Sequence, residues 1–152
     1  MDNHWYFAYG SNLSCRQMEK RTGSIGETRL ARLDGYRIAF NKRSCDGTGK
    51  ANIVPDSSGV VFGVIYWCSD EALSQLDDYE GVESGHYRQN LVRVKSDLGD
   101  DIEAITYIAG SSFIDDTLKP SASYLQTILQ GAQHHGLPKD YISEIKQRAT
   151  RA

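Results

Sequence analysis

Two short segments hold residues whose types and spacing could do chemistry, and the first runs from Tyr9 through Gly10, Ser11 and Asn12 to Leu13. A β-favouring stretch ends there in a glycine and two short polar residues, just before a helical pattern begins. A helix that starts after such a turn leaves its first backbone N–H groups free, and these groups bind anions. The side chains of Ser11 and Asn12 could also orient a carboxylate or an amide. The alternative is a simple strand-to-helix turn.

The second segment, residues 76–81, places the carboxylate of Glu80 at the C-terminal end of a predicted helix. The helix dipole disfavours negative charge at this end, and Asp77, Asp78 and Glu83 are further carboxylates close in sequence. Both effects predict a raised pKa for Glu80, which suits a group that transfers protons near neutral pH. The alternative is a solvated acidic helix end, since exposed charges are well screened.

Three tyrosines, Tyr87, Tyr107 and Tyr124, belong to elements that could converge at one end of a sheet. Most tyrosines are amphipathic core residues with a solvated hydroxyl, and this is the ordinary interpretation here. A shared position near the two segments above would instead make them part of a binding site.

The spacing of the cysteines and histidines in the sequence does not match a metal-binding motif. The cysteines are odd in number and lack a Cys-x-x-Cys spacing: Cys15, Cys45 and Cys68. They fit reduced thiols better than a disulfide framework or a zinc site. Cys15 follows the first segment, where a helix N-terminus could lower its pKa, but no histidine is close in sequence, so it is only a weak nucleophile candidate. The histidines His86, His134 and His135 are not at metal-ligand spacings, and nucleotide motifs are missing, so we expect no metal and no cofactor.

The elements that must position these segments are mainly strands. Patterns of β-branched, aromatic and turn residues predict strands over residues 5–9, 31–40, 51–54, 60–67, 87–95 and 102–108. Pro55 is expected to end the third strand, and Gly63 to mark a bulge or a close backbone contact. Capping patterns predict helices after Ser14, Ser69 and Ser121, and a last helix from Pro138. A strand-rich middle with flanking helices indicates an α+β fold with a mostly antiparallel, curved sheet.

Composition narrows the possible partners. The chain of 152 residues fits a single domain over residues 1–152, because it has no repeat, linker or low-complexity segment. Its net charge of -3 comes from interleaved acidic and basic residues, so nucleic acid is not an expected partner. The first residues lack a signal-peptide layout, and no apolar run reaches the ~20 residues of a membrane span. We therefore expect a cytoplasmic protein without membrane contact.

Together these segments resemble the γ-glutamyl cyclotransferase family, also described as AIG2-like. YGSNL is similar to the substrate loop of that family, and LDDYEGVESGHY is similar to its catalytic segment, with Glu80 at the position of the catalytic glutamate. Tyr124, which follows Pro120 and Ser121, is similar to a late substrate-contacting tyrosine, and Tyr107 matches another pocket tyrosine. The resemblance extends from about residue 7 to about residue 145. Asn12 argues against the glutathione-specific branch, which typically lacks this asparagine.

The resemblance implies a small, closed or nearly closed, mostly antiparallel β-barrel with flanking helices and a site at one mouth. It also implies an internal aminolysis, in which a γ-glutamyl amino acid or amine gives 5-oxoproline and the free amino acid or amine. Glu80 would act as general acid/base. The residues implied in substrate binding are Tyr9, Gly10, Ser11, Asn12, Leu13, Tyr107 and Tyr124.

Other possibilities stay open. The only implied partners are a small γ-glutamyl substrate and, in a homodimer, a second copy of the chain; a monomer is the alternative. The function itself could instead be that of a non-catalytic module that binds a small carboxylate. Within enzymes, the substrate could be a γ-glutamylamine or a γ-glutamyl-protected biosynthetic intermediate.

Overall fold

The computed structural model describes residues 2–150. Along the chain the elements are β1 (Asn3–Ala8), η1 (Ser11–Leu13), α1 (Cys15–Thr22), β2 (Thr28–Arg43), β3 (Gly49–Ser69), α2 (Asp70–Tyr79), β4 (Tyr87–Ser96), β5 (Asp101–Ala109), η2 (Ser111–Phe113), α3 (Ala122–His134) and α4 (Lys139–Thr150). No helix within residues 2–150 has both the length and the apolar character that crossing a membrane requires.

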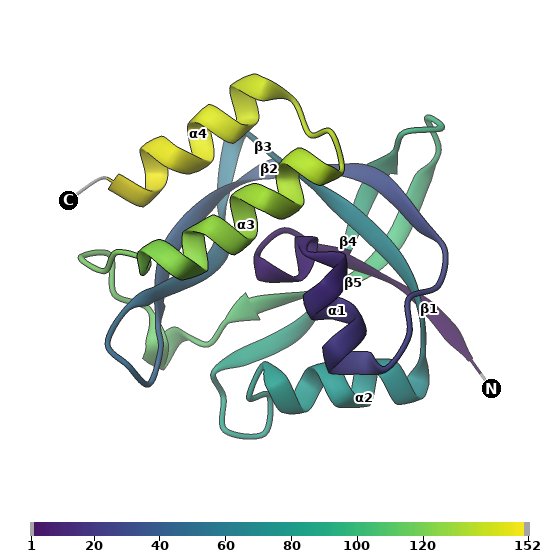
Figure 1. Ribbon diagram of the computed structural model, residues 1–152, viewed down its shortest axis with the longest axis horizontal. Coiled ribbons are helices and arrows are strands. Elements are labelled where there is room, and N and C mark those ends of the chain that lie inside the picture. The colour runs from purple at the N-terminus through teal and green to yellow at the C-terminus, as the bar shows by residue number, and fades with distance from the viewer. Residues whose placement is uncertain (1, 151–152) are drawn as a thin grey trace.

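The strands form a closed barrel in the order β1-β3-β2-β4-β5. Neighbouring strands pair antiparallel, except that β1 and β5 close the barrel as a parallel pair through Tyr6 and Ile105. Helix α4 packs on β2, and α3 lies beside α4 and packs on η1, whereas α1 and α2 lie against each other (Figure 1). The expected α+β barrel with flanking helices is confirmed.

Serine side chains cap three of the helices. Ser14, Ser69 and Ser121 each accept a hydrogen bond from the backbone N–H three residues later, which satisfies a donor that the first helical turn leaves free. These are the caps that the sequence predicts. They fix the starts of α1, α2 and α3, and thereby where each helix meets the barrel.

The course of β3 differs from the prediction. The sequence predicts that Pro55 ends one strand and that another begins at Val60, but β3 is continuous through both residues. Its register on β2 shifts here, because Val60 pairs with Asp34 while Pro55 pairs with Tyr36, and the residues between Pro55 and Val60 bulge out of the ladder. The prediction was wrong because a proline at a bulge does not have to donate a ladder hydrogen bond.

Gly63 on β3 lies against the backbone at the end of β1. A Cβ atom built on Gly63 would lie 2.2 Å from the carbonyl oxygen of Ala8, so no larger residue fits without a backbone shift. Of the two alternatives expected at Gly63, a bulge or a close backbone contact, the structure shows the close contact. It holds the end of β1, from which the loop of residues 9–13 leaves the barrel.

Candidate functional site

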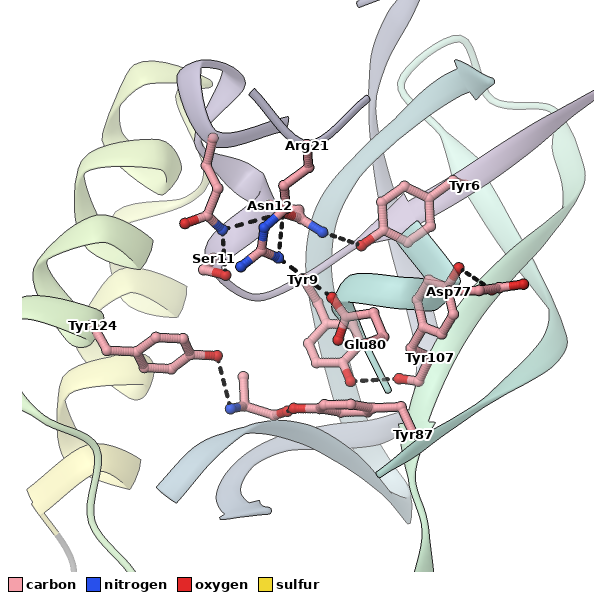
Figure 2. Close-up of polar contacts among 12 residues, drawn as sticks. Tyr6, Tyr9, Ser11, Asn12, Arg21, Asp77, Glu80, Tyr87, Tyr107 and Tyr124 are labelled. Carbon is pink, nitrogen blue, oxygen red and sulfur yellow. Dashed lines mark hydrogen bonds and ion pairs between the residues drawn. The ribbon is translucent and has the colours of Figure 1, made fainter. Parts of the chain in front are cut away.

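A cavity of about 500 Å³ lies at one mouth of the barrel. Most of the residues that the sequence singled out line it, namely Glu80, Tyr9, Gly10, Ser11, Asn12, Tyr87, Tyr107 and Tyr124. Figure 2 shows the side chains of these residues, Gly10 excepted, grouped between the start of α1, the end of α2 and α3. Leu13 is not among the lining residues, because its side chain is fully buried in the core.

The 9–13 loop (Tyr9–Leu13) is a single 3₁₀ turn between β1 and α1. The backbone N–H of Leu13 donates to the carbonyl oxygen of Gly10 at 3.0 Å, which closes the turn. Ser11 and Asn12 begin this turn, and N–H groups at that position have no partner within it. A Cβ atom at Gly10 would lie only 3.1 Å from the Cβ atom of Ala51 on β3, so glycine lets the loop lie against the barrel.

The side chain of Asn12 holds the 9–13 loop to its surroundings. Asn12 is only 3% exposed, and its Nδ2 donates to the hydroxyl oxygen of Tyr6 at 3.0 Å. Its Oδ1 accepts hydrogen bonds from Gln17 Nε2 at 3.2 Å and from Arg21 Nη1 at 3.1 Å (Figure 2). Gln17 Nε2 also donates to the hydroxyl of Ser11 at 2.6 Å. Most of the hydrogen-bonding capacity of Asn12 is therefore used inside the protein.

Glu80 is the C-cap residue of α2, and its side chain is only 15% exposed. Its Oε1 lies 3.5 Å from Arg21 Nη1, so Arg21 bridges Glu80 and Asn12. Burial raises the pKa of Glu80, and the nearby charges of Arg21 and Lys42 oppose part of that rise. The sequence predicted the raised pKa correctly but attributed it to other causes. Its acidic neighbour Asp78 is exposed, and burial of the carboxylate has the larger effect.

Tyr87, Tyr107 and Tyr124 lie together at the cavity, the arrangement that their elements made possible. The hydroxyl of Tyr107 donates to Asp77 Oδ1 at 2.7 Å. The hydroxyl of Tyr87 donates to the carbonyl oxygen of Ala51 at 2.7 Å, and the hydroxyl of Tyr124 accepts from the N–H of the same residue at 3.0 Å. Burial raises the pKa of each of these three tyrosines, so their hydroxyls stay protonated near neutral pH.

Sequence reasoning missed three cations of the cavity. Arg21 comes from α1, Lys42 from β2 and Lys50 from β3. One signal was available for Arg21, because it follows Gln17 by four residues and such a pair shares one helix face. Nothing local marks Lys42 as buried, because the residues that surround it, such as His86 and Phe113, are remote in sequence. With Glu80 as the opposing carboxylate, the lining carries an excess of positive charge that suits an acidic ligand.

Cys15 lies outside the cavity. A histidine that is remote in sequence lies beside it, because His135 Nε2 is 3.5 Å from its Sγ atom. The same nitrogen lies 2.8 Å from the carbonyl oxygen of Leu13, where it can donate a hydrogen bond that supports the 9–13 loop. Within residues 2–150, no group of three or more His, Cys, Asp or Glu residues is arranged to hold a metal ion.

Known proteins share both the sequence and the fold. The sequence model of the AIG2-like family matches residues 60–145. The γ-glutamylcyclotransferase of Homo sapiens is 31% identical over 146 residues, which cover 93% of this chain and 76% of the human protein. The putative γ-glutamylcyclotransferase YkqA of Bacillus subtilis is 28% identical over 149 residues, which cover 94% of this chain and 51% of YkqA.

Solved structures agree with this assignment. A structure titled "Gamma-glutamyl cyclotransferase" has a TM-score of 0.88 and 30% sequence identity, and the match covers 95% of this chain and 87% of that chain. A yeast γ-glutamyl cyclotransferase specific to glutathione has a TM-score of 0.72 at 14% identity, with 98% and 96% of the two chains covered, and shares the fold. From its sequence and its fold, the chain belongs to the γ-glutamylcyclotransferase family of enzymes, which the AIG2-like model also describes.

Proposed function

We propose that the chain converts a γ-glutamyl amino acid or amine to 5-oxoproline and the free amino acid or amine. The α-amino nitrogen of the substrate attacks its own γ-carbonyl carbon and forms the lactam C–N bond. The original amide C–N bond then breaks, and the leaving nitrogen takes up a proton. The observation that carries this proposal is the buried carboxylate of Glu80, which lines a cavity together with the start of the 9–13 loop.

Glu80 is proposed as the general acid/base. The substrate ammonium must lose a proton before attack and the leaving nitrogen must gain one, so a single carboxylate can serve both steps. Burial raises the pKa of Glu80 toward neutrality, whereas Arg21 at 3.5 Å favours the ionised form that accepts the proton. Catalysis of this kind contributes roughly 10²–10⁴ in rate.

The 9–13 loop and the tyrosines are proposed to hold the γ-glutamyl group. The N–H groups of Ser11 and Asn12 are suited to a carboxylate or to the oxyanion that develops on the γ-carbonyl. Tyr9 and Gly10 contribute the adjoining lining, and Leu13 anchors the loop in the core. Tyr107 and Tyr124 wall the cavity and keep the flexible substrate curled for attack. Because the nucleophile belongs to the substrate, the reaction needs no metal or cofactor.

The test is mass-spectrometric detection of 5-oxoproline from a panel of γ-glutamyl amino acids, γ-glutamylamines and glutathione. The protein is expected to release 5-oxoproline from at least one of them, and Glu80→Gln should serve as the matched protein blank. A non-catalytic carboxylate-binding module would bind panel members without releasing 5-oxoproline. That result would contradict the proposed function.

A further inference from the structure

Lys42 is a buried cation, and no carboxylate of residues 2–150 is in salt-bridge contact with it. It lies near the end of β2, lines the cavity and is only 5% exposed. Its Nζ lies 2.7 Å from Nδ1 of His86 and about 5 Å from the ring centroids of Tyr87 and Phe113. Within residues 2–150, no carboxylate oxygen lies within 4.0 Å of Lys42. Burial lowers the pKa of Lys42, and the more distant charge of Glu80 opposes only part of this shift, so an anion from outside the protein that contacts Lys42 would stabilise its charged form.

A second lysine faces the same space. Lys50 on β3 pairs directly with Lys42 across the β2–β3 ladder, and both side chains line the cavity. Like charges at directly opposed positions of an antiparallel pair repel each other. The Nζ atom of Lys50 lies 4.0 Å from the ring centroid of Tyr124, which keeps this charge at the cavity wall.

His86 completes the cluster as a neutral acceptor. Its Nδ1 can accept a hydrogen bond from Lys42 only when that nitrogen carries no proton, and burial together with the charge of Lys42 lowers the pKa of His86. The cluster of Lys42, Lys50 and His86 therefore carries two positive charges. Arg21 is already engaged with Glu80 and Asn12, so the two lysine charges remain for the ligand.

We propose that Lys42 and Lys50 bind a carboxylate on the leaving part of the substrate, so that the enzyme prefers γ-glutamyl amino acids to γ-glutamylamines. This inference rests on the proposed function, which assigns the glutamyl end to Glu80 and the 9–13 loop. A γ-glutamyl amino acid carries a second carboxylate beyond the scissile amide, whereas a γ-glutamylamine has none. The lysine pair supplies the two charges that such a carboxylate can bind.

The experiment compares γ-glutamyl-alanine with γ-glutamyl-alaninamide, which differ only in the charge of the leaving part. The wild type is expected to favour the acid by roughly thirtyfold in kcat/KM, equivalent to about 2 kcal/mol. Lys42→Met should bring this ratio close to one, and Lys50→Met should lower it in the same direction. Lys139→Met is the matched control, because it removes the same charge from an exposed position on α4 and should keep the wild-type ratio.

Two results would overturn the inference: a wild type that does not distinguish the substrates, or a Lys42→Met variant that loses activity on both equally. The latter would assign Lys42 to the glutamyl part or to folding, which thermal melts separate. Calorimetric binding of both compounds to Glu80→Gln gives an independent readout. If Glu80→Gln binds the acid more tightly than the amide but the wild type releases no 5-oxoproline from either, the carboxylate site is supported and the proposed function is contradicted. Equal binding would refute the carboxylate site.

Discussion

Replacing Asn12 by alanine should destabilise the protein as well as impair catalysis. The substitution removes one hydrogen bond donated to Tyr6 and two accepted from Gln17 and Arg21, all at a position that is 3% exposed. Neutral hydrogen bonds contribute about 1 kcal/mol each and those to charged groups about 1.5–3 kcal/mol. Gln17 and Arg21 keep other partners, Ser11 and Glu80, so the expected loss is about 3 kcal/mol.

Thermal unfolding followed by circular dichroism measures this loss. For a chain of this length, about 3 kcal/mol lowers Tm by roughly 6–12 °C. Ser11→Ala is the matched control in the same loop, because it removes a single side-chain hydrogen bond and should lower Tm by only a few degrees. An Asn12→Ala variant that melts with the wild type but binds substrate weakly would refute this reasoning. Asn12 would then act on the ligand instead of on the loop.

Three further outcomes are expected. Gly131→Ala should lower the free energy of unfolding by about 1–3 kcal/mol and reduce turnover, because the added Cβ atom would lie 2.7–2.8 Å from the backbone at the end of the 9–13 loop. Gln130→Ala, at an exposed position beside it, is the control and should change neither stability nor turnover. The kcat/KM of the wild type should fall as pH decreases through the raised pKa of Glu80. Arg21→Met should move this fall to higher pH, because Arg21 favours the ionised form of Glu80. The same pH profile of kcat/KM in Arg21→Met and the wild type would contradict the assignment of Glu80 as the base. Turnover should survive exhaustive chelation, and activity restored by one added metal would show that the expectation is wrong.

Local patterns predicted the parts of the fold that depend on neighbouring residues. The serine caps and the two strands that became β4 and β5 follow from residue types at fixed spacing, as does the close contact that was one of two alternatives at Gly63, and the structure has them all. Pro55 misled the prediction, because a bulge depends on the register of two strands and not on one of them. Closure of the barrel through β1 and β5 joins segments about a hundred residues apart, and here the family resemblance supplied what the local pattern could not.

In the site, too, the local features could be predicted and the features that depend on tertiary structure could not. Glu80 and the 9–13 loop could be singled out because a helix end and a glycine turn are local features. The raised pKa of Glu80 was predicted in the correct direction, but burial is a tertiary property and could not be identified as its cause. For the same reason nothing in the sequence singled out Lys42, which lies beyond the predicted strand of residues 31–40, whereas the structure places it at the cavity, next to His86.

The most direct test of the central claim is to measure binding and turnover separately in Glu80→Gln. At pH values above the raised pKa of Glu80, the buried carboxylate is ionised at a cost to stability, so the amide should be at least as stable as the wild type. The variant should still bind a γ-glutamyl ligand in calorimetry, because the 9–13 loop and the lysines are intact. Release of 5-oxoproline should fall by at least about a hundredfold. Turnover near the wild-type rate in a folded, ligand-binding variant would contradict the account.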